Sequence, residues 1–153
     1  QRLAQNPHPG KVVELFCGSG NFTRIIAESN CTAILAYESE HGAIQTLKTK
    51  NLAKVTPQAT NLFESFVWRK LQKNVIDAET LVLDPPRAGL KKHQGFFDSF
   101  KALKTIYYIS CNPETLCKNL ETLSQTHNVS RLALFDQFPY THHMECGVLL
   151  TAK

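Results

Sequence analysis

The sequence lacks any apolar run long enough to cross a membrane, and it lacks the pattern of a secretory signal peptide. Internal repeats and low-complexity tracts are also missing. Cysteine occurs five times, an odd count, and no pair has a metal-ligand spacing with a second pair to match. These absences argue against a membrane protein and a structural metal site, and they predict a cytoplasmic protein with reduced thiols.

What remains is an ordinary globular composition. Of the 153 residues, 42% are hydrophobic and 20% are charged, which suits one domain with a sizeable core. The formal net charge of +4 permits an anionic partner, but the basic residues form no long run that would identify one. The chain begins at Gln1 rather than Met, so we expect a piece of a longer protein.

Short apolar runs alternate with segments of helical periodicity along the chain. Strands are expected at Lys11–Phe16, Thr32–Tyr37, Val55–Ala59, Thr80–Leu83, Thr105–Ile109, Arg131–Phe135 and Glu145–Ala152. Helices are expected at Phe22–Ser29, His41–Leu52, Leu62–Leu71, Phe96–Leu103 and from Pro113 to about Gln125. This alternation predicts an α/β fold with a mostly parallel sheet and helices on both faces.

The last connection differs from the earlier ones. The segment Asp136–Met144 carries a proline and is too short for the crossover that a parallel neighbour needs. We therefore expect the final strand to run antiparallel to its predecessor, so that Glu145 starts at the edge where the parallel strands end. Open α/β sheets bind ligands at that edge.

A glycine-rich turn follows the first expected strand. It contains Gly18, Gly20 and Asn21, and Glu38 ends the second strand. Glycine lets the backbone approach a ligand closely, and an acid at the end of the second strand can accept hydrogen bonds from ribose hydroxyls. Thr23 occupies the position where the NAD-binding fingerprint has a third small residue, so the match to that fingerprint is imperfect. The pattern predicts binding of a nucleotide-type cofactor, S-adenosylmethionine or NAD; the alternative is a tight turn beside a solvated acid.

Two further motifs follow strands. In Asp84-Pro85-Pro86-Arg87 the prolines stiffen a loop that presents an acid to the cleft, although a structural turn with a surface salt bridge is an alternative.

Cys111 precedes Asn112-Pro113, a helix N-cap followed by proline at the first helical position. A thiol next to free helix amides is favoured as a thiolate, and a small buried cysteine is the alternative.

The segment before the last strand contains two adjacent histidines, His142 and His143, followed by Glu145. Neighbours on a strand point to opposite faces, and no third ligand completes a standard site, so we expect no metal here. Histidines that orient Glu145 are the preferred interpretation, and a solvated Glu145 remains open.

With these motifs placed, the chain resembles the RNA 5-methyluridine methyltransferases. The resemblance rests on ELFCGSGNFT, LDPPRAG, YISCNPETLCKNL and FPYTHHMECGVLL, and it spans nearly the whole chain. It implies a Rossmann-like class I methyltransferase fold with a seven-stranded sheet, and it makes residues 1–153 a catalytic domain, the C-terminal part of a longer protein. It also implies methyl transfer from S-adenosylmethionine to carbon 5 of an RNA uridine, with tRNA and its T-loop uridine as the expected substrate.

The same resemblance implies residue roles. Cys111 is the expected nucleophile and Glu145 the expected base. The residues expected to bind S-adenosylmethionine are Phe16, Gly18, Gly20, Asn21, Glu38 and Asp84.

Competing functions stay open. The family's whole proteins carry RNA-binding parts and a cofactor-contacting glutamine upstream, for which Gln1 to Gly10 has no counterpart, so this fragment could be one that only binds RNA or a partner. Three enzyme classes also stay open: a ribosomal RNA uridine methyltransferase, an amino-nitrogen methyltransferase and an NAD dehydrogenase. Ribosomal members bind an iron–sulfur cluster through upstream cysteines that this chain does not have.

Overall fold

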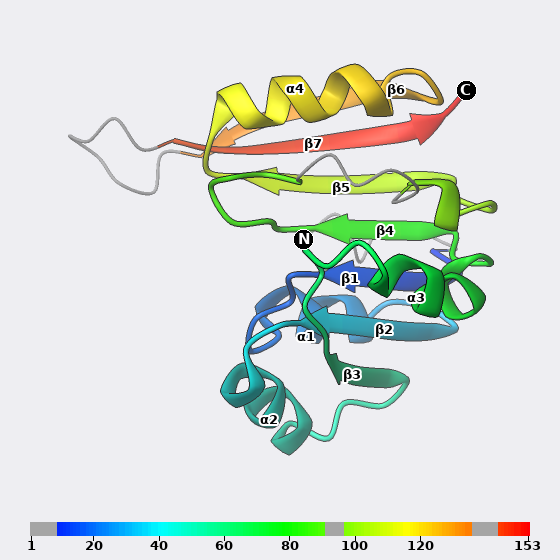
Figure 1. Ribbon diagram of the computed structural model, residues 1–153, viewed down its shortest axis with the longest axis vertical. Coiled ribbons are helices and arrows are strands. Elements are labelled where there is room, and N and C mark those ends of the chain that lie inside the picture. Colours follow the sequence, from blue (N-terminus) through cyan, green and yellow to red (C-terminus); the bar gives the residue numbers. More distant parts are fainter. Residues whose placement is uncertain (1–8, 91–96, 136–143) are drawn as a thin grey trace.

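The computed structural model describes residues 9–90, 97–135 and 144–153. The strands described form one seven-stranded sheet in the order β3-β2-β1-β4-β5-β7-β6 (Figure 1). The strands are β1 (Lys11–Leu15), β2 (Ala33–Glu38), β3 (Val55–Ala59), β4 (Thr80–Leu83), β5 (Thr105–Ser110), β6 (His127–Phe135) and β7 (Glu145–Ala152). The helices are α1 (Asn21–Ala27), α2 (His41–Thr49), α3 (Val67–Val75), α4 (Pro113–Leu123) and the 3-10 turn η2 (Phe97–Ser99).

Strands β1 to β5 pair in parallel, and β7 pairs antiparallel with both β5 and β6. In Figure 1 the arrowheads of β1, β2, β4 and β5 point to one edge of the sheet, whereas β7 starts at that edge and runs away from it. The expected α/β fold, the seven strands and the antiparallel last strand are thus confirmed.

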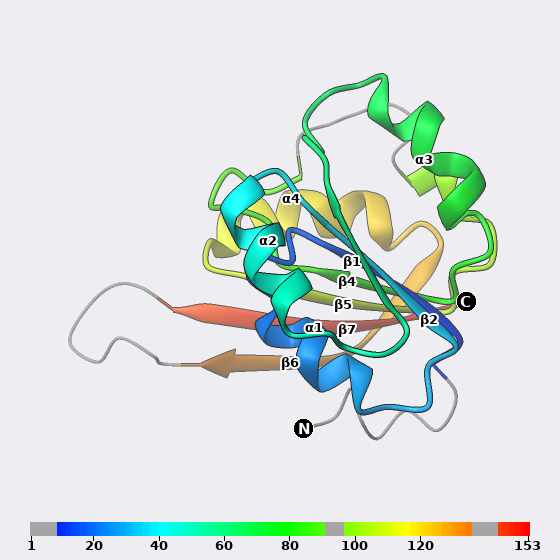
Figure 2. The same ribbon diagram turned by 90° about the horizontal axis from the view of Figure 1, so that it is seen from below.

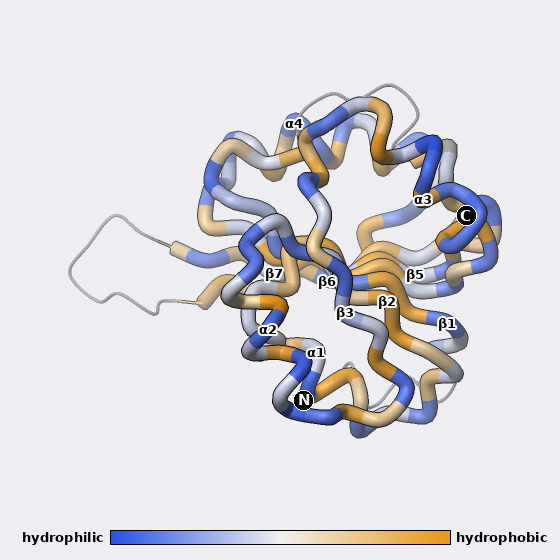
Figure 3. Tube along the Cα trace, turned by 60° about the horizontal axis from the view of Figure 1, so that its bottom comes forward, coloured by the Kyte–Doolittle hydropathy of each residue, from blue (hydrophilic) through white to orange (hydrophobic). Residues whose placement is uncertain are grey.

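Helices cover both faces of the sheet, and Figure 2 shows α3 and α4 on one side with α1 on the other. The larger core joins alternate strand residues such as Leu83 and Tyr108 to Trp68 of α3 and Leu116 of α4. On the opposite face, Ile26 of α1 packs in a second cluster, and α2 packs in a third. Figure 3 shows the hydrophobic stretches concentrated along the strands. Burial on both faces explains why the central strand β4 is apolar throughout.

The strand ends are aligned by the pairing register. Leu15 at the end of β1 pairs with Tyr37 on one side and with Leu83 on the other. Leu83 in turn pairs with Tyr108, and Ser110 pairs with Cys146 of β7. Residues that follow these positions therefore lie along a single edge of the sheet, as predicted from the sequence.

The helix expected at Leu62–Leu71 is wrong at its start, because α3 begins only at Val67. The Asn61 side chain accepts a hydrogen bond from the backbone N–H of Phe63 at 3.1 Å and donates one to the Glu64 carboxylate. An asparagine that binds its own neighbouring backbone offers the chain a turn in place of a helix. The apolar residues before Val67 therefore lie in turns and not in a helix.

Two more expected elements differ in extent. Strand β6 begins at His127, four residues before the expected Arg131, and its pairing with β7 continues past an irregularity between Val129 and Arg131. Between Phe97 and Leu103 the structure has only the short turn η2 in place of a helix. Phe96 and most of the expected loop before β7, including His142 and His143, lie outside the described residues, so the expected orienting role of the histidines stays a prediction.

Candidate functional site

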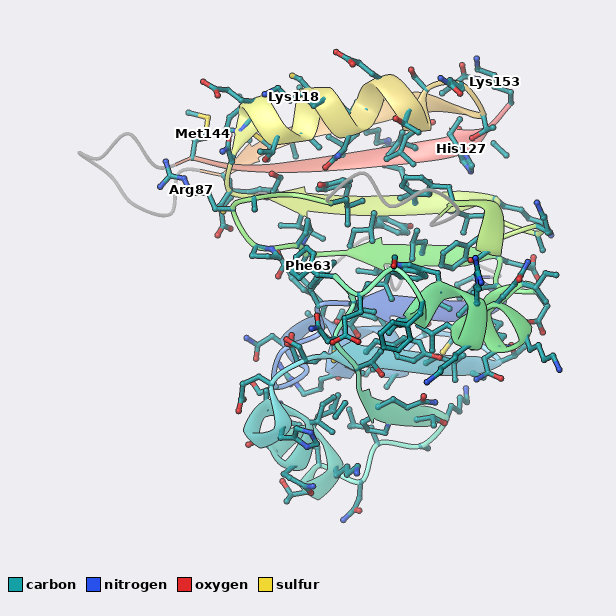
Figure 4. All side chains as sticks on the ribbon, in the orientation of Figure 1. Phe63, Arg87, Lys118, His127, Met144 and Lys153 are labelled. Atoms are coloured by element: carbon teal, nitrogen blue, oxygen red, sulfur yellow. The ribbon has the colours of Figure 1, made fainter. Side chains whose placement is uncertain are left out.

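The predicted site residues converge on the edge where β1, β2, β4 and β5 end and β7 begins. Figure 4 shows this end of the sheet with Arg87, from the loop after β4, and Met144, directly before β7. Phe63 lies at the same end, whereas His127 and Lys153 lie at the opposite end. The topology thus brings together residues that are far apart in sequence.

The turn after β1 is tied to Glu38 at the end of β2. The backbone N–H of Gly18 donates to the Glu38 carboxylate at 3.1 Å, and the N–H groups of Ser39 and Glu40 donate to the other carboxylate oxygen. These three donors fix the acid at the cleft edge. Gly18 has a φ of +52°, and a Cβ there would meet no atom within 4 Å, so its Cα faces open space.

The expected contact of Gly20 with the cofactor stays a prediction, and the structure gives this glycine a packing role in the turn. Its φ is +88°, and a Cβ there would overlap Cδ1 of Leu47 in α2. Gly20 is therefore required for the packing of the turn against α2 and for the left-handed backbone before α1. Asn21, at the first position of α1, is exposed at this turn. Phe16 leaves β1 with a φ of +63° and is half-buried.

An acid that the sequence interpretation did not single out lies beneath this turn. Glu14 is only 1% exposed, and the Thr23 hydroxyl of α1 donates to its carboxylate at 2.6 Å. Burial, with a smaller contribution from the nearby Asp84 charge, raises the pKa of Glu14 to about 7 despite that hydrogen bond. The sequence signal was a carboxylate between apolar residues, Val13 and Leu15, in an expected buried strand.

Asp84 follows β4 and is mostly buried. Its pKa is raised to about 6, first by burial and second by the charge of Glu145. Among the described residues, none donates a hydrogen bond to the Asp84 carboxylate, so its oxygens can accept bonds from a ligand.

Cys111 sits on the strand-to-helix turn that its sequence context predicted. The Asn112 side chain accepts hydrogen bonds from the backbone N–H groups of Glu114 and Thr115, and Pro113 opens α4. The Ser110 hydroxyl donates to the Asn112 carbonyl and accepts from the Asn112 N–H at 3.1 Å. Pro113 has no N–H, and the N–H groups of Asn112, Glu114 and Thr115 are all hydrogen-bonded. The expectation of free helix amides beside the thiol is therefore wrong, because the cap already occupies them.

Exposure separates Cys111 from most of the cysteines in the chain. Cys17, Cys31 and Cys146 are buried, whereas Cys111 and Cys117 are exposed. Burial and the charges of Glu14 and Glu38 raise the pKa of Cys17 to about 12, so this cysteine remains a thiol. Cys117 lies within α4, away from the strand end, which leaves Cys111 as the exposed thiol at the cleft edge.

Glu145 is the first residue of β7 and is half-buried. The antiparallel register between β5 and β7 ends at the pair Ser110 and Cys146. Cys111 directly follows the first of these residues and Glu145 directly precedes the second. The register therefore brings a thiol and a carboxylate from distant sequence positions to the same edge of the sheet.

Phe63 is a second residue that the sequence interpretation did not single out. Its ring packs on Phe16, with 5.5 Å between ring centroids and an angle of 42° between the planes. The turn at Asn61, which delays the start of α3, positions Phe63. The two tilted aromatic rings beside the glycine-rich turn offer an apolar surface to a ligand.

Neither a metal-ligand cluster nor a membrane-spanning helix is found in the described part of the chain. Within residues 9–90, 97–135 and 144–153, no three His, Cys, Asp or Glu side chains are grouped as metal ligands. Over the same ranges, no helix is both long and apolar enough to span a bilayer.

The sequence matches a known family over almost its whole length. The family described as tRNA (Uracil-5-)-methyltransferase matches residues 2–153. An uncharacterized RNA methyltransferase of Nitrosomonas europaea is 49% identical over 144 residues, which cover 94% of this chain and 37% of the relative. The tRNA/tmRNA (uracil-C(5))-methyltransferase of Citrobacter koseri is 47% identical over 160 residues, covering 94% of this chain and 42% of the relative. The chain thus spans about two fifths of the length of these relatives.

Solved structures share the fold. The tRNA (uracil-54, C5)-methyltransferase of Pyrococcus abyssi, in complex with S-adenosyl-L-homocysteine, superimposes with a TM-score of 0.76 at 21% identity, covering 98% of this chain and 36% of that one. TrmK of M. capricolum, in complex with S-adenosyl-homocysteine, gives 0.68 at 7% identity, covering 99% of this chain and 66% of that one. The fold is the Rossmann-like fold of class I S-adenosylmethionine-dependent methyltransferases.

Proposed function

The chain belongs to the tRNA (uracil-5-)-methyltransferase family, and from that premise we propose that residues 1–153 are a catalytic domain that methylates carbon 5 of a uridine in RNA. We take tRNA as the substrate, because the Citrobacter koseri relative is named for tRNA and tmRNA. We take the T-loop uridine as the target because the sequence resemblance implies it. The observation that supports the proposal is the pairing register, which ends at Ser110 and Cys146 and so brings Cys111 and Glu145 to the same edge of the sheet.

The residues at the edge fit S-adenosylmethionine. Backbone N–H groups hold Glu38, and its carboxylate can accept hydrogen bonds from the ribose hydroxyls of the cofactor. Gly18 leaves open space in front of the turn. Phe16, Asn21 and Asp84 complete the set of residues that would hold it. When bound, the cofactor supplies an electrophilic methyl group on a sulfonium.

Carbon 5 of uracil is a weak nucleophile, so the chain must activate the ring. Cys111, after giving up its proton to solvent, adds to carbon 6, and the electron pair of the ring double bond moves to form an enolate that is nucleophilic at carbon 5. Carbon 5 then forms its bond to the methyl carbon as the bond between that carbon and the sulfonium breaks. The exposed position of Cys111 suits this step, because a uridine in a folded loop must be flipped out to reach it.

Glu145 completes the reaction as the base. It removes the proton from carbon 5, the electron pair re-forms the ring double bond, and the bond between carbon 6 and the Cys111 sulfur breaks. The position of Glu145 at the start of β7, one residue before the partner of Ser110, supports this role. We place the reaction in the cytoplasm, where a catalytic thiol stays reduced.

The experiment that tests the proposal traps the covalent intermediate. The protein is incubated with S-adenosylmethionine and a T-loop RNA that carries 5-fluorouridine at the target position. Fluorine cannot leave carbon 5 as a proton does, so an RNA–protein adduct accumulates. The expected adduct maps to Cys111 and disappears in Cys111→Ala.

Controls make the outcome specific. Cys117→Ala, at the second exposed cysteine, is expected to form the adduct at the wild-type level. A ribosomal RNA hairpin with the same fluorinated base separates the tRNA substrate from a ribosomal one. An adduct that persists in Cys111→Ala, or methylated uridine made by that variant, would overturn the mechanism.

A further inference from the structure

The loop after β4 and the helix after β5 are joined by a set of side chains that no catalytic role has used. Asn112, Thr115 and Asn119 lie three and four positions apart, so they share one face of α4. That face meets the loop from Asp84 to Leu90, which carries the cofactor-site acid. We call these three residues and their bonds to the loop the α4 clamp.

The strongest part of the clamp is Asn119. Its Oδ1 accepts from the backbone N–H of Leu90 at 3.1 Å, and its Nδ2 donates to the Leu90 carbonyl at 3.1 Å. The hydroxyl of Tyr108, three residues before the nucleophile, donates to the same Oδ1 at 2.7 Å. One half-buried amide therefore links β5, α4 and the loop.

The middle of the loop is also held, at Arg87. The Asn112 side-chain N–H donates to the Arg87 carbonyl at 3.4 Å. The Thr115 hydroxyl lies 3.3 Å from the same carbonyl and 3.0 Å from the Asn112 carbonyl, so its one proton is shared between the two acceptors. Gly89 allows the contact to be this close. A Cβ there would lie 2.9 Å from Oδ1 of Asn119 and 3.0 Å from Cβ of Thr115, and its φ is +67°.

We propose that Asn119 is a positioning residue that locks the Asp84–Leu90 loop to the helix beginning at the nucleophile turn. The clamp makes Asp84, on the cofactor side, and Cys111, on the uridine side, parts of one rigid unit. This inference rests on the proposed function, in which the methyl group and carbon 5 must meet in one defined geometry. Misplacement by about 1 Å costs on the order of 100-fold in rate.

The test combines a structural and a kinetic measurement on the same variants. Asn119→Ala removes the link to Leu90 and Tyr108, whereas Thr115→Val removes one hydroxyl with little change of shape. Thr115→Ser restores that hydroxyl, and Glu121→Ala alters an exposed residue of the same helix as a control. Hydrogen exchange of the Leu90 amide reports the clamp, and the single-turnover rate of methyl transfer reports the chemistry.

The clamp predicts a specific pattern of results. In Asn119→Ala, Leu90 exchanges faster, and kcat falls roughly 10- to 100-fold while KM for RNA stays within about twofold. Thr115→Val lowers kcat by a smaller factor, Thr115→Ser recovers it, and Glu121→Ala matches the wild type. All rates are measured well below the unfolding midpoint of each variant.

Two results would overturn the inference. The first is unchanged protection of the Leu90 amide in Asn119→Ala. The second is faster exchange together with a wild-type kcat, which would make the clamp only structural. If the wild-type protein methylates no uridine, the proposed function fails instead, and the exchange measurement still decides whether the clamp holds the loop.

Discussion

Substitution of Glu14 by glutamine should change how the stability of the protein depends on pH. Glu14 is 1% exposed and accepts a hydrogen bond from Thr23. Burial raises its pKa from 4.5 to about 7, so the folded state holds a proton that the unfolded state has released. At about 1.36 kcal/mol per pKa unit, this difference corresponds to about 3 kcal/mol.

The sign follows from proton linkage. Between pH 4.5 and 7 the folded state binds more protons at Glu14 than the unfolded state does, so the free energy of unfolding falls as the pH rises. The contribution of the protonated Glu14 carboxyl to stability is fully present below pH 4.5 and is lost as the pH rises through 7. The glutamine side chain does not titrate and still offers an oxygen to the Thr23 hydroxyl, so Glu14→Gln should lack this decline.

The assay is urea unfolding of the wild type and Glu14→Gln from about pH 4.5 to 8, the range that brackets the two pKa values. Asp84 has a raised pKa of about 6 and titrates in the same range, but it is present in both proteins and largely cancels in the difference. Over this pH range, the free energy of unfolding of the wild type should fall by about 3 kcal/mol relative to that of Glu14→Gln. Glu28→Gln, at an exposed glutamate, is the matched control and should follow the wild type. Parallel curves for the wild type and Glu14→Gln would refute the reasoning, because they would mean that Glu14 is ionised at no cost.

Three further predictions concern the cleft. Glu145→Gln should still form the Cys111 adduct but release the methylated RNA slower by about 100-fold or more, as measured by rapid quench, because the base is lost; prompt release would assign the base elsewhere. Glu38→Ala should weaken S-adenosylmethionine binding by at least about tenfold in calorimetry, because buried ligand polar groups lose their acceptor; unchanged affinity would exclude the acid from the cofactor site. Gly20→Ala should lower the free energy of unfolding in urea by about 1–3 kcal/mol, because its Cβ overlaps Leu47 at a positive φ. Leu47→Ala removes the overlapping atom, so the losses from the two substitutions should be less than additive in the double variant; additive losses would refute the overlap.

Local sequence signals determined much of this protein. The alternation of apolar runs and helical patterns is enough for a parallel α/β sheet, and β3, β4 and β7 have the bounds that were expected. Asn112-Pro113 predicted the start of α4, because capping and the fixed φ of proline act within a few residues. The proline-containing connection before β7 was too short for a crossover, which sets the direction of β7 and brings Glu145 to the site edge.

Only the tertiary structure decided the features that depend on partners distant in sequence. The protonation of Glu14 requires its burial under α1, and the requirement for glycine at position 20 arises from Leu47 in α2. The late start of α3 follows from the turn at Asn61, whose side chain competed with helical periodicity. The bond between Asn119 and Leu90 joins residues that are 29 positions apart, and no local pattern in the sequence encodes such a contact. These contacts exist because the sheet packs its helices and loops together, and packing is a property of the folded chain as a whole.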